Sequence, residues 1–207
     1  VMRYNPSPLY CTLPSNGQLS LINPHGVLFG KTAQVSVGGL FASTLPINTT
    51  AFMQGSGAYA FNAVGTSGQV INQGQLKAVN GGFVVLAGQQ VINRGTIDAT
   101  AGTVALASGS SVTLKLDNSG QLSVNVTAAT LGALIQNQGL IEADGGQVLL
   151  TARGLGMLQT NVMNLSGVLQ ANSIGTKNGR IVIDGGNAAL GDSGVVSVLN
   201  ATVNAIG

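Results

Sequence analysis

Short apolar stretches recur along this chain and end in the same way. Four times, an apolar stretch ends in Asn, and the chain turns through Gly and restarts. These segments are residues 70–74, 91–95, 135–139 and, in a degenerate form, 164–167. After each Gly, apolar and polar residues alternate, and a second Gly leads into a second apolar strand. Asn72 to Asn93 is about one period of twenty-odd residues, and Asn93 to Asn137 is about two, which is the spacing expected of a solenoid.

This periodicity predicts the fold. A pair of strands this short cannot bury a face alone, so each copy must be covered by the next one. Strands of two-residue period, separated by Gly and Asn and not by helical stretches, favour a parallel β-helix. We therefore predict an all-β, right-handed parallel β-helix whose stacked coils form a single domain over residues 1–207. At roughly 4.8 Å per coil, about eight or nine coils would make a rod on the order of 40 Å long.

Composition agrees with coils that stack aliphatic side chains. The chain is 44% hydrophobic and only 7% charged, with 31 Gly, and these values argue against a charged helical bundle and against disorder. A stack of parallel coils exposes unpaired strand edges at both ends unless a cap covers them. Neither residues 1–4 nor residues 203–207 resemble a cap, so we expect a piece of a longer polypeptide.

Two segments interrupt the repeat. Residues 111–116 and 121–126 alternate with period two around Asp-Asn-Ser-Gly, which predicts an antiparallel β-hairpin at about 111–126, lying outside the helix. A second segment, at about 44–68, is predicted to be irregular and also extra-helical. It carries Phe52, Tyr59 and Phe61; these aromatic residues are interpreted as covering a face of the rod, with a ligand site as the alternative.

Charged and sulfur-containing residues exclude several function classes. The net charge of +2 comes from scattered basic residues, whereas a nucleic-acid site needs a stripe of Lys and Arg, usually with stacking aromatics. We therefore predict no nucleic-acid partner. Cys11 is the only cysteine and His25 the only histidine, so neither a disulfide framework nor a Cys/His metal cluster is available, and we predict no cofactor or metal.

An enzyme is the main competing class, because some parallel β-helices act on polysaccharides. That chemistry needs carboxylates that converge on one face, and Glu142 and Asp144 are the only close pair of acidic residues. Asp144 introduces Gly145-Gly146 and is better interpreted as a turn residue. A nucleophile such as Cys11 would have only His25 as a base. We predict that the chain is not an enzyme, and a carbohydrate-active β-helix remains the less favoured alternative.

The most specific segment is residues 16–30, which read NGQLSLINPHGVLFG. This segment resembles the NGQVFLINPNGILFG signature of the secretion domain at the N-terminus of two-partner secretion exoproteins, the filamentous-haemagglutinin and haemolysin-like family. Residues 35–45, VSVGGLFASTL, and the lead-in at residues 5–13 are similar to further parts of the family pattern. The family normally carries about sixty residues before this point, so its N-terminal cap is expected to be missing here.

Residues 23–26, here named the corner turn, carry the candidate secretion motif. They are Asn23, Pro24, His25 and Gly26, a sequence in which the Asn side chain can close an Asx bond, Pro presets φ and Gly accepts an unusual conformation. One interpretation is a structural corner that folds the chain onto the growing stack, and the other is direct reading by the transporter. His25 stands where the family usually has Asn, and we expect the turn to tolerate it.

The resemblance implies a mechanism of export. Such a domain is presented in the periplasm to modules of a dedicated outer-membrane transporter, crosses largely unfolded, and nucleates vectorial folding of a β-helical adhesin, haemolysin or contact-dependent toxin. The implied location is the bacterial cell surface or the extracellular medium, with a host surface receptor as a possible partner of the full-length protein. The alternative function is a β-helical adhesin segment that binds host glycan or protein directly.

Overall fold

The computed structural model describes residues 5–47, 58–65, 67–116, 122–155, 162–174, 178–185, 196–198 and 202–204. Strands β1 to β21 are the regular elements of these residues, which contain no helix. No helix in this described part of the chain is long and apolar enough to cross a membrane. The prediction of an all-β protein is confirmed.

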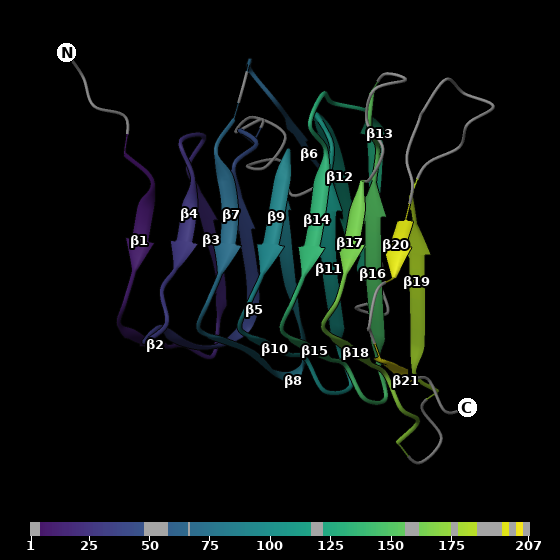
Figure 1. Ribbon diagram of the computed structural model, residues 1–207. Helices are drawn as coiled ribbons and strands as arrows, with labels where there is room; N and C mark the ends of the chain where they lie inside the picture. Colours follow the sequence, from purple (N-terminus) through teal and green to yellow (C-terminus); the bar gives the residue numbers. More distant parts are fainter. Residues whose placement is uncertain are drawn as a thin grey trace.

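One parallel sheet forms the front of the molecule in Figure 1. Its seven strands, in spatial order, are β1 (Ser7–Leu9), β4 (Val27–Phe29), β7 (Gln69–Asn72), β9 (Gln90–Asn93), β14 (Leu134–Asn137), β17 (Met163–Leu165) and β20 (Val196–Val198). Every neighbouring pair is parallel. Each strand therefore lies beside its counterpart in the next repeat.

A second parallel sheet makes the other two faces of each coil, because β5 (Gln34–Ser43) and β8 (Gln75–Gly88) continue round a corner. The lower face adds β2 (Thr12–Pro14), β10 (Thr96–Asp98), β15 (Leu140–Glu142), β18 (Val168–Gln170) and β21 (Thr202–Asn204). The rear face adds β3 (Gln18–Ile22), β11 (Thr103–Ser108), β16 (Gln147–Ala152) and β19 (Arg180–Asp184).

We number the coils from the N-terminus, so coil 1 is β1 to β3, coil 2 is β4 and β5, coil 3 is β7 and β8, coil 4 is β9 to β11, coil 5 is β14 to β16, and coil 6 is β17 to β19. Strands β20 and β21 belong to a seventh. Front strands run down and rear strands run up as the coils advance from left to right, which makes the helix right-handed (Figure 1). The expectation of eight or nine coils was too high for the described residues, because the insertions use chain length outside the stack.

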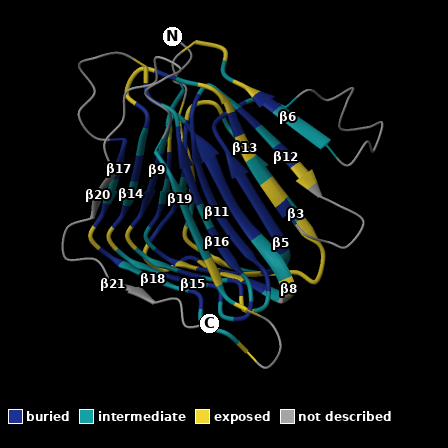
Figure 2. Cartoon of the chain, turned by 90° about the vertical axis from the view of Figure 1, so that its right-hand side faces the viewer, coloured by how far each residue is buried: buried dark blue, intermediate teal, exposed yellow. Residues whose placement is uncertain are grey.

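The interior is filled by aliphatic side chains that stack in register. Leu40, Val84, Val104 and Val148 occupy equivalent positions on the rear faces of coils 2 to 5 and are fully buried. Figure 2 shows this buried interior enclosed by the sheets. Each such side chain is removed from water by its neighbours above and below, so burial that no single coil achieves is shared along the stack.

Glycine follows the repeated Asn because successive coils approach closely. A Cβ at Gly95 would collide with the backbone carbonyl of Gly74, and one at Gly139 would collide with that of Gly95. Neither Gly95 nor Gly139 has a positive φ, so the backbone conformation does not demand glycine here. Contact between stacked backbones explains this part of the sequence repeat.

An antiparallel sheet packs on the outside of the rear face. It consists of β6 (Ala58–Asn62), β12 (Ser111–Leu116) and β13 (Leu122–Ala128), in the order β13-β12-β6. The predicted extra-helical hairpin is confirmed, whereas the segment predicted as irregular contributes strand β6. Phe61 and Leu114 pack with Phe41, Val85 and Ala105 in a second apolar core between this sheet and the coils. Phe52 and the predicted hairpin turn at 117–120 lie outside the described residues.

Candidate functional site

The corner turn joins β3 of coil 1 to β4 of coil 2. The backbone nitrogen of Gly26 donates to the carbonyl oxygen of Asn23 at 3.0 Å, which closes a four-residue turn. The backbone nitrogen of His25 donates to the side-chain oxygen of Asn23 at 2.9 Å. This second bond is the Asx bond that the sequence predicted, and it uses a side chain to fix the turn.

The side chain of Asn23 also ties the turn to the start of coil 1. Its Nδ2 atom donates to Oγ of Ser7 at 2.8 Å and to the carbonyl oxygen of Asn5 at 3.3 Å. Its backbone nitrogen donates to the carbonyl oxygen of Ser43, at the end of coil 2, at 3.0 Å. Asn23 therefore contacts the start of coil 1 through its side chain and the end of coil 2 through its backbone.

Gly26 is held where a larger residue would be strained. Its φ is 130°, a left-handed value that favours glycine, and a Cβ would lie 3.0 Å from Cβ of Pro6. The carbonyl oxygen of Gly26 accepts from the nitrogen of Ser7 at 2.9 Å, and that of Pro24 accepts from the nitrogen of Gly68 at 2.7 Å. The corner turn thus lies between the start of coil 1 and the start of coil 3.

The four predicted residues are adjacent but differ in exposure. Pro24 and His25 are exposed, Asn23 is half-buried and Gly26 is buried. Asn23 and Gly26 bond to coils 1 and 2, and the backbone of Pro24 and His25 also takes part in fixing the turn. The outer pair is presented at the surface. Both interpretations of the motif therefore have residues that fit them.

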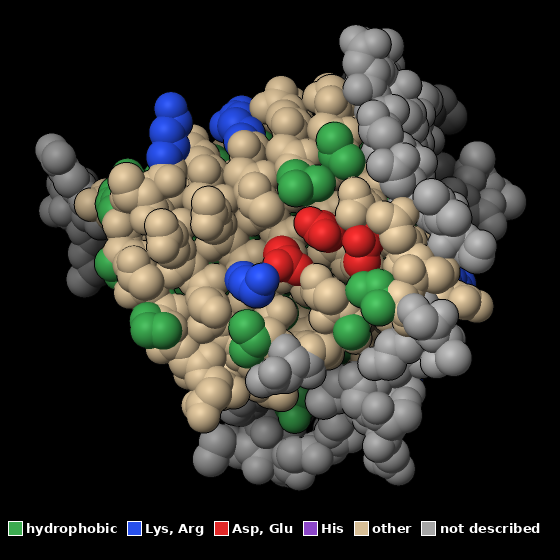
Figure 3. All heavy atoms as spheres, turned by 90° about the horizontal axis from the view of Figure 1, so that it is seen from below, with side chains coloured by type: hydrophobic (Ala, Val, Ile, Leu, Met, Phe, Trp, Pro, Cys, Tyr) green, Lys and Arg blue, Asp and Glu red, His purple; other side chains and the backbone are tan. Residues whose placement is uncertain are grey.

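Acidic residues gather on the lower face, where Figure 3 shows acidic side chains beside a basic one. Strand register places Lys77 next to Asp98 and Asp98 next to Glu142, and Lys77 Nζ lies 2.7 Å from Asp98 Oδ2. Burial raises the pKa of Asp98, but hydrogen bonds from Lys77 and Thr100 outweigh it and hold the pKa below its usual value. Burial, with the nearby charges of Asp144 and Asp98, raises the pKa of Glu142.

Two of these carboxylates have structural partners, because Asp98 pairs with Lys77 and Asp144 fixes a turn. Asp144 lies in a turn, as predicted, and accepts hydrogen bonds from the backbone nitrogen of Asn172 at 2.7 Å and from Nε2 of Gln170 at 2.9 Å. Within the described residues, no group of three His, Cys, Asp or Glu side chains could hold a metal ion. The sequence did not place Lys77 beside the acidic residues, because that contact depends on the register between coils.

The sequence matches one protein family and two curated proteins over most of its length. The sequence profile of the family described as "TPS secretion domain" matches residues 1–198. Two proteins named "Heme/hemopexin-binding protein" from Haemophilus influenzae, one of them from strain Rd, are 35% identical over 191 residues and 32% identical over 207 residues. Each match covers 90% of this chain, but only 21% and 22% of the relative. The chain therefore spans about a fifth of the length of these relatives.

The fold also matches a solved structure. The crystal structure of the HMW1 secretion domain from Haemophilus influenzae superimposes with a TM-score of 0.58 at 19% identity, over 92% of this chain and 64% of that one. Exoproteins with a TPS domain are secreted through a partner transporter in the outer membrane, and the part of such a protein that matches this chain is a secretion domain, in agreement with the sequence prediction. Because the family profile covers nearly the whole chain, this protein belongs to the TPS secretion domain family of two-partner secretion exoproteins.

Proposed function

We propose that periplasmic modules of the partner transporter bind this domain at the corner turn, and that the same turn sets the first coils on which the rest of the protein folds. The carrying observation is the division of the turn into two pairs of residues. Asn23 and Gly26 bond to coils 1 and 2. Pro24 and His25 are exposed for a partner, although the backbone carbonyl of Pro24 also bonds to Gly68 at the start of coil 3.

The strand pairing supports folding from the N-terminus. Every coil strand pairs in parallel with its counterpart in the preceding coil, for example β9 on β7 and β11 on β8. A chain that emerges N-terminus first can therefore add each coil to a finished template. Burial of each new coil outside the cell would oppose sliding of the chain back into the transporter.

Secretion and folding must be measured separately to test this proposal. Asn23→Ala and the double variant Pro24→Ala/His25→Ala would be produced together with the partner transporter, and the secreted protein quantified. Thermal unfolding of each purified domain would be followed in parallel. The matched control is Lys31→Ala, which alters an exposed residue in the next turn of the chain.

We expect Asn23→Ala to lower the unfolding temperature and the secreted amount together. We expect the Pro24/His25 variant to lower secretion several-fold with little change in unfolding temperature, and the control to change neither. If both corner-turn variants are secreted in undiminished amounts, the turn has no part in export and the proposal fails.

Beyond this domain, we propose that the whole protein reaches the cell surface or the extracellular medium after transient passage through the periplasm. Its activity there, as adhesin, haemolysin or contact-dependent toxin, is a separate question. The names of the curated relatives make heme or hemopexin binding a further activity to test. Retention of the full-length protein on immobilised hemopexin, set beside a glycan array, would separate these classes.

A further inference from the structure

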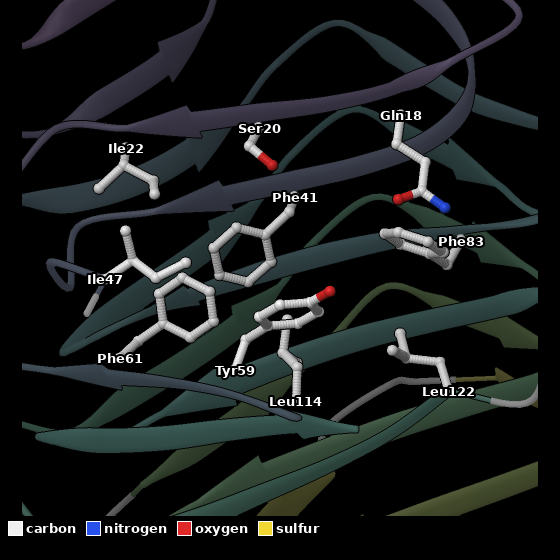
Figure 4. Close-up of a pocket in the computed structure, with 10 residues that line it drawn as sticks. All are labelled: Gln18, Ser20, Ile22, Phe41, Ile47, Tyr59, Phe61, Phe83, Leu114 and Leu122. Carbon is white, nitrogen blue, oxygen red and sulfur yellow. The ribbon is translucent and has the colours of Figure 1, made fainter. Parts of the chain in front are cut away.

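A cavity of about 510 Å³ lies between the outer surface of β3, β5 and β8 and the extra-helical sheet. We name it the outer pocket. Figure 4 shows Gln18 and Ser20 on one side of it and Tyr59 and Leu114 on the opposite side, with Phe41 between them. The pocket adjoins the second apolar core, where the rings of Phe41 and Phe61 have their centroids 4.2 Å apart.

Gly39 helps to shape this pocket. Strand register places Gln18, Gly39 and Phe83 side by side on successive coils. Because Gly39 has no side chain, the ring of Phe83 lies across it, and a Cβ at this position would be 2.8 Å from Cε1 of that ring. A side chain at residue 39 would therefore push the ring of Phe83 out of its place in the wall.

The lining has a distinctive chemistry. Phe41, Tyr59, Phe61 and Phe83 all line the pocket, and they are four of only eight Phe and Tyr residues in the chain. Among the described residues, none that lines the pocket carries a charge, and the polar groups of this lining are the amide of Gln18 and the hydroxyls of Ser20 and Tyr59. A volume between about 300 and 1,000 Å³ with an apolar lining and a few polar groups is typical of small-molecule sites.

We propose that the outer pocket binds a small, uncharged, planar aromatic molecule. Aromatic walls favour a flat ligand through offset and edge-to-face stacking, and an amide and hydroxyls serve a ligand that has one or two neutral polar groups. A charged ligand would lose its hydration without gaining an ion pair, since the lining residues that the structure describes offer no charged group. This proposal is independent of recognition by the transporter.

Two fluorescent probes test the predicted ligand class on the purified domain. N-phenyl-1-naphthylamine is neutral, whereas 8-anilinonaphthalene-1-sulfonate has a similar aromatic framework and a negative charge. We expect the neutral probe to bind with one-to-one stoichiometry and at least tenfold more tightly than the sulfonate. Equal binding of both probes, several equivalents per domain, or no saturable binding of the neutral probe would overturn the proposal.

Two substitutions test whether the neutral probe binds in the outer pocket. Ser20 is exposed and lies beside Phe41 in the strand register, so Ser20→Trp places an indole in the pocket. The matched control is Ser36→Trp, at an exposed position of β5 on the lower face. We expect Ser20→Trp to weaken binding of the neutral probe at least tenfold and Ser36→Trp to leave it unchanged, with far-UV circular dichroism confirming that both domains are folded.

A second variant that fills the outer pocket with an indole keeps the test decisive if Ser20→Trp does not fold. We call Ser20→Trp and this second variant the filling variants. Gln18→Trp adds an indole from the neighbouring outward position of β3, where Gln18 is exposed. Loss of binding in whichever filling variant is folded supports the proposal. Unchanged binding in a folded filling variant places the probe elsewhere and contradicts it.

Discussion

Asn72 donates a hydrogen bond from Nδ2 to Oδ1 of Asn93, and the two atoms are 2.8 Å apart. Asn93 repeats the contact toward Asn137, again at 2.8 Å, and all three side chains are fully buried. The Oδ1 atom of Asn72 accepts from the backbone nitrogen of Gly74 at 3.1 Å. This ladder joins coils 3, 4 and 5 and explains why Asn recurs before each turn.

Removal of the Asn93 side chain, the middle one of the three, should destabilise the stack of coils. Asn93→Ala removes the donor to Oδ1 of Asn137 and leaves Nδ2 of Asn72 with only the longer bond, 3.4 Å, to the carbonyl oxygen of Thr96. Buried polar groups that lose partners are costly. We expect the free energy of unfolding to fall by about 2–4 kcal/mol, measured by urea denaturation. Asn178→Ala, at an exposed Asn, should change it by less than about 0.5 kcal/mol; equal losses in the two variants would show that the ladder is not the cause.

Substitution of Gly95, the glycine that follows Asn93 in the repeat, should destabilise the stack as strongly as substitution of Asn93. A Cβ at Gly95 would collide with a backbone carbonyl of the preceding coil, which cannot move without disturbing the stack. Gly95→Ala should therefore cost about 3 kcal/mol or more, or prevent folding. At Gly17 a Cβ would have its nearest neighbour, Oγ of Ser15, at 3.6 Å, so Gly17→Ala should be neutral or stabilise by up to about 1 kcal/mol. Thermal unfolding of both variants distinguishes these outcomes.

The sequence predicted the coil because the coil is locally encoded. Asn, Gly and alternating apolar residues recur within each period, and each has a local cause, such as the Asn72 ladder or the close approach at Gly95. The corner turn was also predictable, since the Asx bond of Asn23 spans two residues. Such contacts leave their pattern in a short window of sequence.

Contacts set by register or by distant pairing were not predictable. Strand β6 pairs with β12, where Phe61 lies opposite Val112, and nothing near residue 61 indicates that partner. The outer pocket depends on the same pairing, because it forms only when β6 is laid over the rear face. Lys77 lies beside Asp98 only in the observed register of β8 and β10, which the repeat alone does not specify to the residue.

The ion pair between Arg153 and Asp184 should couple coils 5 and 6. Nη1 and Nη2 of Arg153 each lie 2.7 Å from a carboxylate oxygen of Asp184, a bidentate geometry that strengthens such pairs. A double-mutant cycle with Arg153→Ala and Asp184→Ala should give a coupling energy of about 1 kcal/mol that shrinks in 1 M NaCl. The same cycle on Lys77 and Asp98, where the Lys side chain is 56% exposed, should give a smaller value; a larger one would contradict this ranking.

Stability on the lower face should respond to pH in two opposite ways. The pKa of Asp98 is lower in the folded protein than its ordinary value of 3.8, so its charged form stabilises the fold above that pH, and the contribution is lost as the pH falls through the folded pKa. Asp98→Asn should therefore destabilise the domain at pH 7 by less than about 1 kcal/mol, and this difference should shrink below about pH 4.

The pKa of Glu142 is raised above 4.5, so its protonated form is favoured in the fold, and that stabilisation is lost as the pH rises through the folded pKa. Glu142→Gln should accordingly be more stable than the parent at pH 7, with the gain disappearing at pH 3. Urea titrations at both pH values check both signs, and a Glu142→Gln variant less stable than the parent at pH 7 would show that its carboxylate supports the lower face.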